Sequence, residues 1–164
     1  MCPRECRVNR NANEKGFCSA NTLACVNISM HHFGEEPIIS GTDDSRGSGT
    51  IFMEGCNLKC VFCQNSVIST NLTGYGTEYT ADDLAELYLR LQEEGCNNIN
   101  LVTVMHYAPV VVKSLEKARN SGLIIPVIIN TGGYDKVDTL KMFDGLVDIY
   151  LPDMKFYSSQ LSQA

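Results

Sequence analysis

The chain has 164 residues, of which 44% are hydrophobic and 20% are charged, a composition typical of one globular domain rather than a disordered protein. A formal net charge of −6 argues against a nucleic-acid-binding surface, because phosphate contacts require clustered Lys and Arg. No apolar run approaches the roughly 18 residues of a membrane span, and residues 1–10 are too polar for a secretory signal peptide. We therefore expect a cytoplasmic protein without nucleic-acid or membrane partners. Its high content of eight cysteines indicates metal binding rather than a disulfide framework, although Cys96 is most simply a buried small apolar residue.

Residues 1–47 are predicted to form an irregular, Cys-rich N-terminal extension. Gly, Asn and Asp are scattered through it, and one strand is expected near residues 23–29. Four thiols gather in this extension, namely Cys2, Cys6 and Cys18 with Cys25 as a candidate fourth ligand. Such a set suits a structural zinc ion or an auxiliary iron–sulfur cluster.

Residues 48–164 are predicted to form an α/β domain in which apolar strands alternate with amphipathic helices. Strands are expected at residues 50–54, 98–104, 124–130 and 146–151, and helices at residues 80–94, 109–120 and 136–143. This alternation indicates a parallel sheet with right-handed crossovers. Because about four parallel strands leave an uncovered edge, we expect a partial (β/α) barrel in a chain that is truncated at its C-terminus.

The first and second of these helices carry the clearest local signals. Thr80 and Asp83 form a capping box at the start of the first helix, and Gly95 ends it. Their inward faces are expected to consist of Leu84, Leu87, Tyr88 and Leu91 in the first helix and of Val111, Val112, Leu115 and Ala118 in the second. Both helices should therefore pack on the sheet.

Three cysteines follow directly after the first strand of the α/β domain. Cys56, Cys60 and Cys63 have the spacing Cys-x3-Cys-x2-Cys. Three thiolates on one short loop can ligate three irons of a [4Fe–4S] cluster and leave the fourth iron open. The alternative is a zinc site, for which Cys96 is the nearest downstream ligand. The position after a strand favours the cluster, because α/β folds carry their chemistry at the carboxyl ends of the strands.

With this triad the chain resembles the radical SAM superfamily, and within it the pyruvate formate-lyase activating enzyme-like branch with an N-terminal Cys-Pro-Arg-x-Cys motif. The matching stretches are residues 2–10, 16–18, 32–37, 47–65, 98–107 and 147–155. The resemblance implies a [4Fe–4S] cluster that cleaves S-adenosylmethionine (SAM) reductively to a 5′-deoxyadenosyl radical for hydrogen abstraction. It also implies a reductant such as flavodoxin or ferredoxin and, as in activating enzymes, a protein substrate.

The resemblance further implies SAM-binding residues at the strand ends and, beside the last cysteine of the triad, Phe62. The family's Gly-Gly-Glu motif is absent after the second strand, where Thr103 and His106 are the polar groups in its place. Asn130 follows the third strand and resembles the Asp/Asn-Thr-x-Gly motif. Asp153 and Lys155 resemble the Asp-x-Lys motif after the fourth strand. Each position also has a competing structural interpretation. His106 could be a core histidine, the segment after Asn130 a plain strand-to-helix turn, and Asp153 with Lys155 a surface ion pair.

Two further functions stay open at this point. The first is a non-enzymatic binding module stabilised by zinc or by an iron–sulfur cluster. The second is an inactive fragment of a longer radical SAM enzyme.

Overall fold

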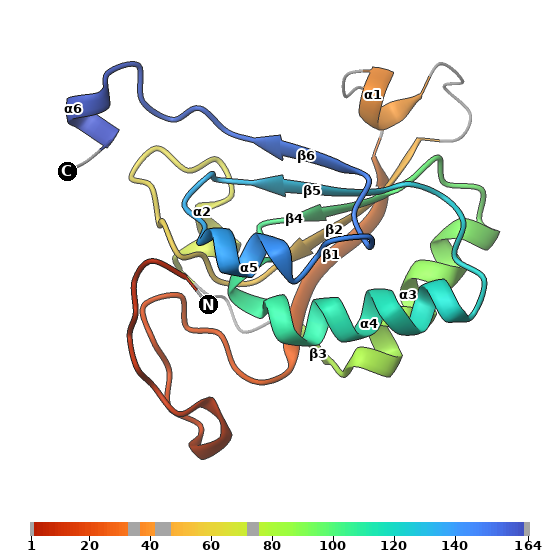
Figure 1. Ribbon diagram of the computed structural model, residues 1–164, viewed down its shortest axis with the longest axis horizontal. Coiled ribbons are helices and arrows are strands. Elements are labelled where there is room, and N and C mark those ends of the chain that lie inside the picture. Colours follow the sequence, from red (N-terminus) through yellow and green to blue (C-terminus); the bar gives the residue numbers. More distant parts are fainter. Residues whose placement is uncertain (1, 33–36, 42–46, 72–75, 163–164) are drawn as a thin grey trace.

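The computed structural model describes residues 2–32, 37–41, 47–71 and 76–162 (Figure 1). Residues 1, 33–36, 42–46, 72–75 and 163–164 lie outside the described part of the chain. Most of the matching stretch at residues 32–37 is therefore outside it too.

The described residues form a mixed sheet of six strands in the order β3-β1-β2-β4-β5-β6. The strands are β1 (Ala24–His32), β2 (Ser48–Met53), β3 (Thr77–Tyr79), β4 (Ile99–Val102), β5 (Val127–Thr131) and β6 (Ile149–Pro152). The expected parallel strands are confirmed as β2, β4, β5 and β6. The strand expected near residues 23–29 is β1, which pairs antiparallel with β2 and with β3. The α/β class is confirmed, and closure into a barrel stays a prediction.

Two long helices, α3 and α4, correspond to the predicted helices at residues 80–94 and 109–120. The helices are α1 (Pro37–Ser40), α2 (Ser66–Ser69), α3 (Ala81–Glu93), α4 (Ala108–Asn120), α5 (Val137–Lys141) and α6 (Ser159–Ser162), with 3-10 turns at Arg10–Ala12 and Met105–Tyr107. The capping box of α3 is confirmed: the Thr80 hydroxyl accepts from the Asp83 amide, and the Asp83 carboxylate accepts from the Thr80 amide. The hydrogen bonds that the Thr80 hydroxyl and amide donate to the Asp83 carboxylate lower the pKa of Asp83. No helix within the described ranges is long and apolar enough to cross a membrane.

The two faces of the parallel strands differ in chemistry, because successive side chains in a strand point to opposite faces. One face is apolar and packs against α3 and α4, which lie side by side in Figure 1. Its buried residues are Ile51, Met53, Ile99, Leu101, Val127 and Ile129 from the sheet, with Leu84, Leu87, Tyr88 and Leu91 from α3 and Val111, Leu115 and Ala118 from α4. The alternate residues, including Thr50, Asn100 and Asn130, face away from these helices toward a cavity. The side that these two helices leave open therefore carries polar side chains together with apolar ones such as Phe52 and Val102.

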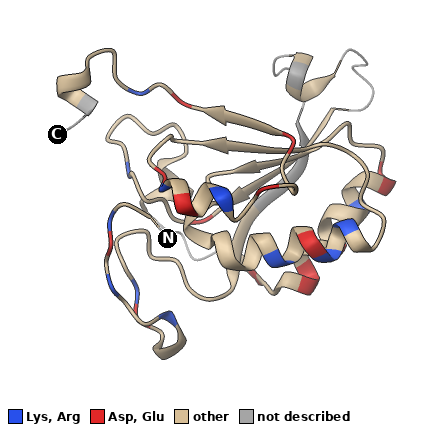
Figure 2. Ribbon diagram, in the orientation of Figure 1, with Lys and Arg blue, Asp and Glu red and all other residues tan. Residues whose placement is uncertain are grey.

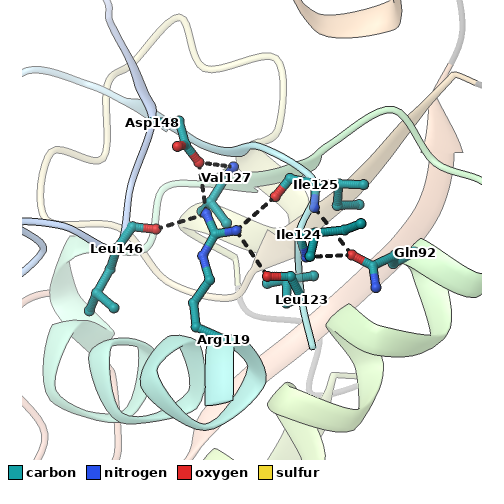
Figure 3. Close-up of polar contacts among 8 residues, drawn as sticks. All are labelled: Gln92, Arg119, Leu123, Ile124, Ile125, Val127, Leu146 and Asp148. Carbon is teal, nitrogen blue, oxygen red and sulfur yellow. Dashed lines mark hydrogen bonds and ion pairs between the residues drawn. The ribbon is translucent and has the colours of Figure 1, made fainter. Parts of the chain in front are cut away.

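A polar network fixes the amino ends of β5 and β6 to the two long helices (Figure 3). Arg119 of α4 donates to the carbonyls of Leu123 and Ile125, at 3.1 Å each, and pairs with Asp148 at 2.8 Å. The same carboxylate accepts from the Val127 amide at 2.8 Å, at the first residue of β5. Gln92 of α3 accepts from the amides of residues 124 and 125. This network lies at the opposite end of the strands from the cysteine loop.

Candidate functional site

A cavity of about 560 Å³ opens where the parallel strands end. Its walls come from the loop that follows β2 and from the ends of β4, β5 and β6. The cavity is lined by Cys56, Cys60 and Cys63 of the triad and by Phe62, Thr103, Asn130, Asp153 and Lys155. The structure thus brings together every residue expected at the main site except His106.

The cysteine loop is irregular, and local hydrogen bonds define its path. Gly55 starts it with a φ of 83°, a left-handed conformation that glycine adopts without strain. The amide of Cys63 donates to the carbonyl of Cys60 at 3.1 Å, and the amide of Leu58 donates to the sulfur of Cys56 at 3.3 Å. The sulfur of Cys63 lies 3.3 Å from the hydroxyl of Ser69 in α2. All three thiols are half-buried on one wall of the cavity.

Two braces hold this loop from distant parts of the chain. Arg4 of the N-terminal extension donates to the carbonyl of Asn57 at 2.8 Å, and its guanidinium lies 3.9 Å from the ring centroid of Phe17. The Asn57 side chain donates to the carbonyl of Tyr134, after β5, at 2.8 Å. Sequence reasoning missed Arg4 and Asn57, because their role depends on contacts between residues far apart in the chain.

The ends of β4 and β5 show backbone features that suit close approach of a ligand. Thr103 has a φ of 57°, a conformation that is uncommon for a β-branched residue, and its amide donates to the carbonyl of Asn130 at 2.9 Å. A side chain at Gly132 would place its Cβ 2.5 Å from Leu58 of the cysteine loop. The Leu58 side chain would have to shift to accept a side chain here, so Gly132 keeps room for it.

The end of β6 supplies a pair of opposite charges. Lys155 and Asp153 form an ion pair at 2.5 Å on the cavity wall. Burial by itself lowers the pKa of Lys155, but Asp153 and the neighbouring Cys60 and Cys63 raise it above the usual value. Lys155 therefore stays charged at neutral pH and faces the triad.

His106 is not brought to this cavity. The 3-10 turn Met105–Tyr107 directs it into the protein, where it is 1% exposed and its Nε2 lies 2.9 Å from the carbonyl oxygen of Glu54. Burial lowers its pKa to about 4, so the imidazole is neutral at neutral pH. The structure places His106 beneath the start of the cysteine loop as a core residue.

The N-terminal cysteines divide into two groups. Cys2, Cys6 and Cys18 line a second cavity of about 790 Å³ between the N-terminal extension and the start of α4, and Cys25 does not. The thiol of Cys25 donates to the Glu54 carboxylate at 3.1 Å, and burial together with this contact raises its pKa to about 12. Cys25 is thus a protonated thiol that is not brought together with the other three.

The donor set of the main cavity fits an iron–sulfur cluster. In the part of the chain that the structure describes, no three His, Cys, Asp or Glu side chains are already arranged as a metal site. The triad nevertheless offers three thiols that form no disulfide and lie on one irregular loop. An amide lies beside the sulfur of Cys56, and a hydroxyl lies beside the sulfur of Cys63. Thiolate ligands of this kind, with hydrogen bonds to sulfur, are those that hold and tune such clusters.

Two comparisons relate this chain to known proteins. The family model of the radical SAM superfamily matches residues 50–157, which include the triad and the ends of β4, β5 and β6. The chain is also 30% identical over 168 residues to an uncharacterized protein of Methanocaldococcus jannaschii, over 99% of this chain and 47% of that protein. The chain therefore spans about half the length of this relative.

Proposed function

Because the chain belongs to the radical SAM superfamily, we propose that it binds a [4Fe–4S] cluster and SAM and uses them to abstract hydrogen from a substrate. The observation that supports this best is the shared cavity. Three cysteines with the family's spacing and polar groups from three consecutive parallel strands line the same space. The carboxyl ends of parallel strands are where α/β folds place ligands.

In this proposal Cys56, Cys60 and Cys63 are the cluster ligands. When bound, the cluster supplies the electron that cleaves SAM into methionine and a 5′-deoxyadenosyl radical. The protein holds the three thiolates on one loop, stabilises their charge through the Leu58 amide and the Ser69 hydroxyl, and keeps bulk water from the half-buried wall.

The remaining lining residues are proposed to bind SAM. Lys155 offers a cation for its carboxylate, and Asp153 offers an anion for its positively charged groups. Thr103 and Asn130 provide hydrogen bonds at adjacent strand ends, and Phe62 provides apolar contact at the mouth of the cavity.

The finer part of the proposal is a reaction like that of pyruvate formate-lyase activating enzymes. It includes flavodoxin or ferredoxin as the electron donor, a protein substrate, and a reducing, cytoplasmic location. Cys2, Cys6 and Cys18 are proposed to hold zinc or a second cluster. Cys25 is the least favoured fourth ligand, because its thiol is bonded to Glu54.

Anaerobic reconstitution tests the main proposal. The chain should take up iron and sulfide for a [4Fe–4S] cluster at the triad, and its EPR spectrum should change when SAM is added. Cys60→Ala should lose the iron bound at the triad and the response to SAM, whatever metal Cys2, Cys6 and Cys18 hold. Cys96→Ala is the matched control, since it removes a buried thiol outside the cavity and should keep them. Zinc uptake without iron would refute the proposal and favour the binding module instead.

A further inference from the structure

Two asparagines stand on the same face of β4, two residues apart. Asn98 immediately precedes the strand and is 4% exposed, and Asn100 lies within it and is 3% exposed. Both are therefore buried polar side chains, which normally require hydrogen-bond partners. The protein satisfies one of them and not the other.

Asn98 is satisfied within the protein. Its Oδ1 accepts from the hydroxyl of Ser48 at 2.7 Å, and its Nδ2 donates to the carbonyl of Ile39. It does not line the cavity. Asn98 is thus a structural polar residue that joins β4 to β2 and α1.

Asn100 differs in both respects. It lines the cavity, and no protein group within the described ranges pairs with its buried Oδ1. Thr50, its register partner on β2, also lines the cavity, but its hydroxyl donates to Ser48 at 3.3 Å. The Thr50 proton is therefore directed away from Asn100. Two oxygen acceptors, those of Asn100 and Thr50, remain at this position on the cavity wall.

The surroundings of Asn100 are neutral. β2, β4 and β5 contain no charged residue, whereas charges gather on the helices and the N-terminal extension (Figure 2). Asn100 lies two positions before Val102, the last residue of β4, and so about 7 Å deeper than the strand end at a rise of about 3.3 Å per residue. It is thus set apart from the ion pair of Asp153 and Lys155. An acceptor in neutral surroundings complements a neutral donor.

We propose that Asn100 binds the substrate on the floor of this cavity, with its Oδ1 accepting a hydrogen bond from a neutral amide N–H or hydroxyl group. This inference rests on the proposed function, because it assigns the floor to the molecule from which hydrogen is abstracted. The ligand would supply the hydrogen-bond donor that Asn100 Oδ1 lacks among the described residues.

Thermal unfolding of the cluster-free, 164-residue chain is the first test. Asn100→Leu removes an unpaired acceptor and should keep the melting temperature or raise it by about 2–4 °C. The matched control Asn98→Leu leaves Ser48 and the Ile39 carbonyl without their partner and should lower it. If Asn100→Leu lowers the melting temperature as much as Asn98→Leu does, Asn100 is structural and the inference is wrong.

Binding of small probes is the second test, followed through the side-chain amide NMR signal of Asn100, which is assigned by its loss in Asn100→Leu. N-methylacetamide carries one N–H donor, 1,2-propanediol carries hydroxyl donors, and N,N-dimethylacetamide carries no donor. A saturable shift of the Asn100 signal with N-methylacetamide indicates a substrate with an amide N–H. A saturable shift with 1,2-propanediol indicates a substrate with a hydroxyl group. An equal response to N,N-dimethylacetamide, or no response to any probe, would overturn the inference. Because no cluster is needed, these results are independent of a failure to bind iron, which would refute only the proposed function.

Discussion

Lowering the pH from 7 to 4 should destabilise the folded chain through His106, because its imidazole is buried in the neutral form. The pKa of His106 falls from 6.5 to about 4 on folding, mainly through burial. Between these values the unfolded chain binds a proton that the native chain does not, so stability is lost as the pH falls through this window. The loss from this one residue reaches about 3 kcal/mol at pH 4.

Urea unfolding at pH 7, 6, 5 and 4, followed by circular dichroism, measures this loss. The comparison is with His106→Gln, because the difference between the two proteins isolates the contribution of this one residue. Glutamine keeps a donor for the Glu54 carbonyl but does not titrate. Between pH 7 and pH 4 the free energy of unfolding of the His106→Gln variant should therefore fall by about 3 kcal/mol less than that of the unsubstituted protein. If the two proteins lose stability in parallel, His106 is not held neutral in the core, and its assignment as a buried residue would be refuted.

Three further substitutions test contacts that hold the cysteine loop and the strand ends in place. Gly55→Ala should cost about 1–3 kcal/mol more than Gly95→Ala in urea unfolding, because both glycines have positive φ but only Gly55 has a backbone oxygen 2.2 Å from the new Cβ; equal losses would contradict the clash. Arg119→Lys should cost about 1–3 kcal/mol by the same assay, since a single ammonium cannot serve all the carbonyls that the guanidinium reaches. Arg4→Ala should loosen the cysteine loop by about 1–2 kcal/mol and so speed tryptic cleavage after Lys59 roughly 5- to 30-fold; an unchanged rate would show that the loop does not depend on Arg4.

The fold was predictable from sequence wherever an element was long enough to show periodicity. α3 and α4 extend over several turns, and the capping box at Thr80 was predicted correctly. Their inward residues were also predicted correctly, except that Val112 is only partly buried. β3, α1, α2 and α6 contain only three or four residues each, which is too short for a hydrophobic period to appear. The pairing of β1 with β2 also left no local signal, because it is a long-range contact.

In the site too, residues in sequence motifs could be predicted, whereas residues whose role depends on distant contacts could not. The triad was expected at the carboxyl ends of the parallel strands, where α/β folds carry their chemistry. Asn130, Asp153 and Lys155 were expected there from the resemblance to the radical SAM superfamily, and they line the same cavity. His106 is turned into the core by a 3-10 turn that the sequence does not reveal. Asn98 and Asn100 look alike in the sequence, and only their surroundings separate a structural residue from one that lines the cavity.

The N-terminal extension contributes to the candidate site by direct contact with the cysteine loop. That loop has no regular secondary structure, so its position depends on segments that are distant in sequence. Arg4 bonds to Asn57, Asn57 bonds to Tyr134, and the backbone of Cys18 lies against Gly55 so closely that no side chain fits there. A change in the extension must therefore reach the triad through these contacts, because a packed contact transmits displacement. The extension thus stabilises the candidate cluster site through Arg4 and Cys18 independently of any metal held by its own cysteines.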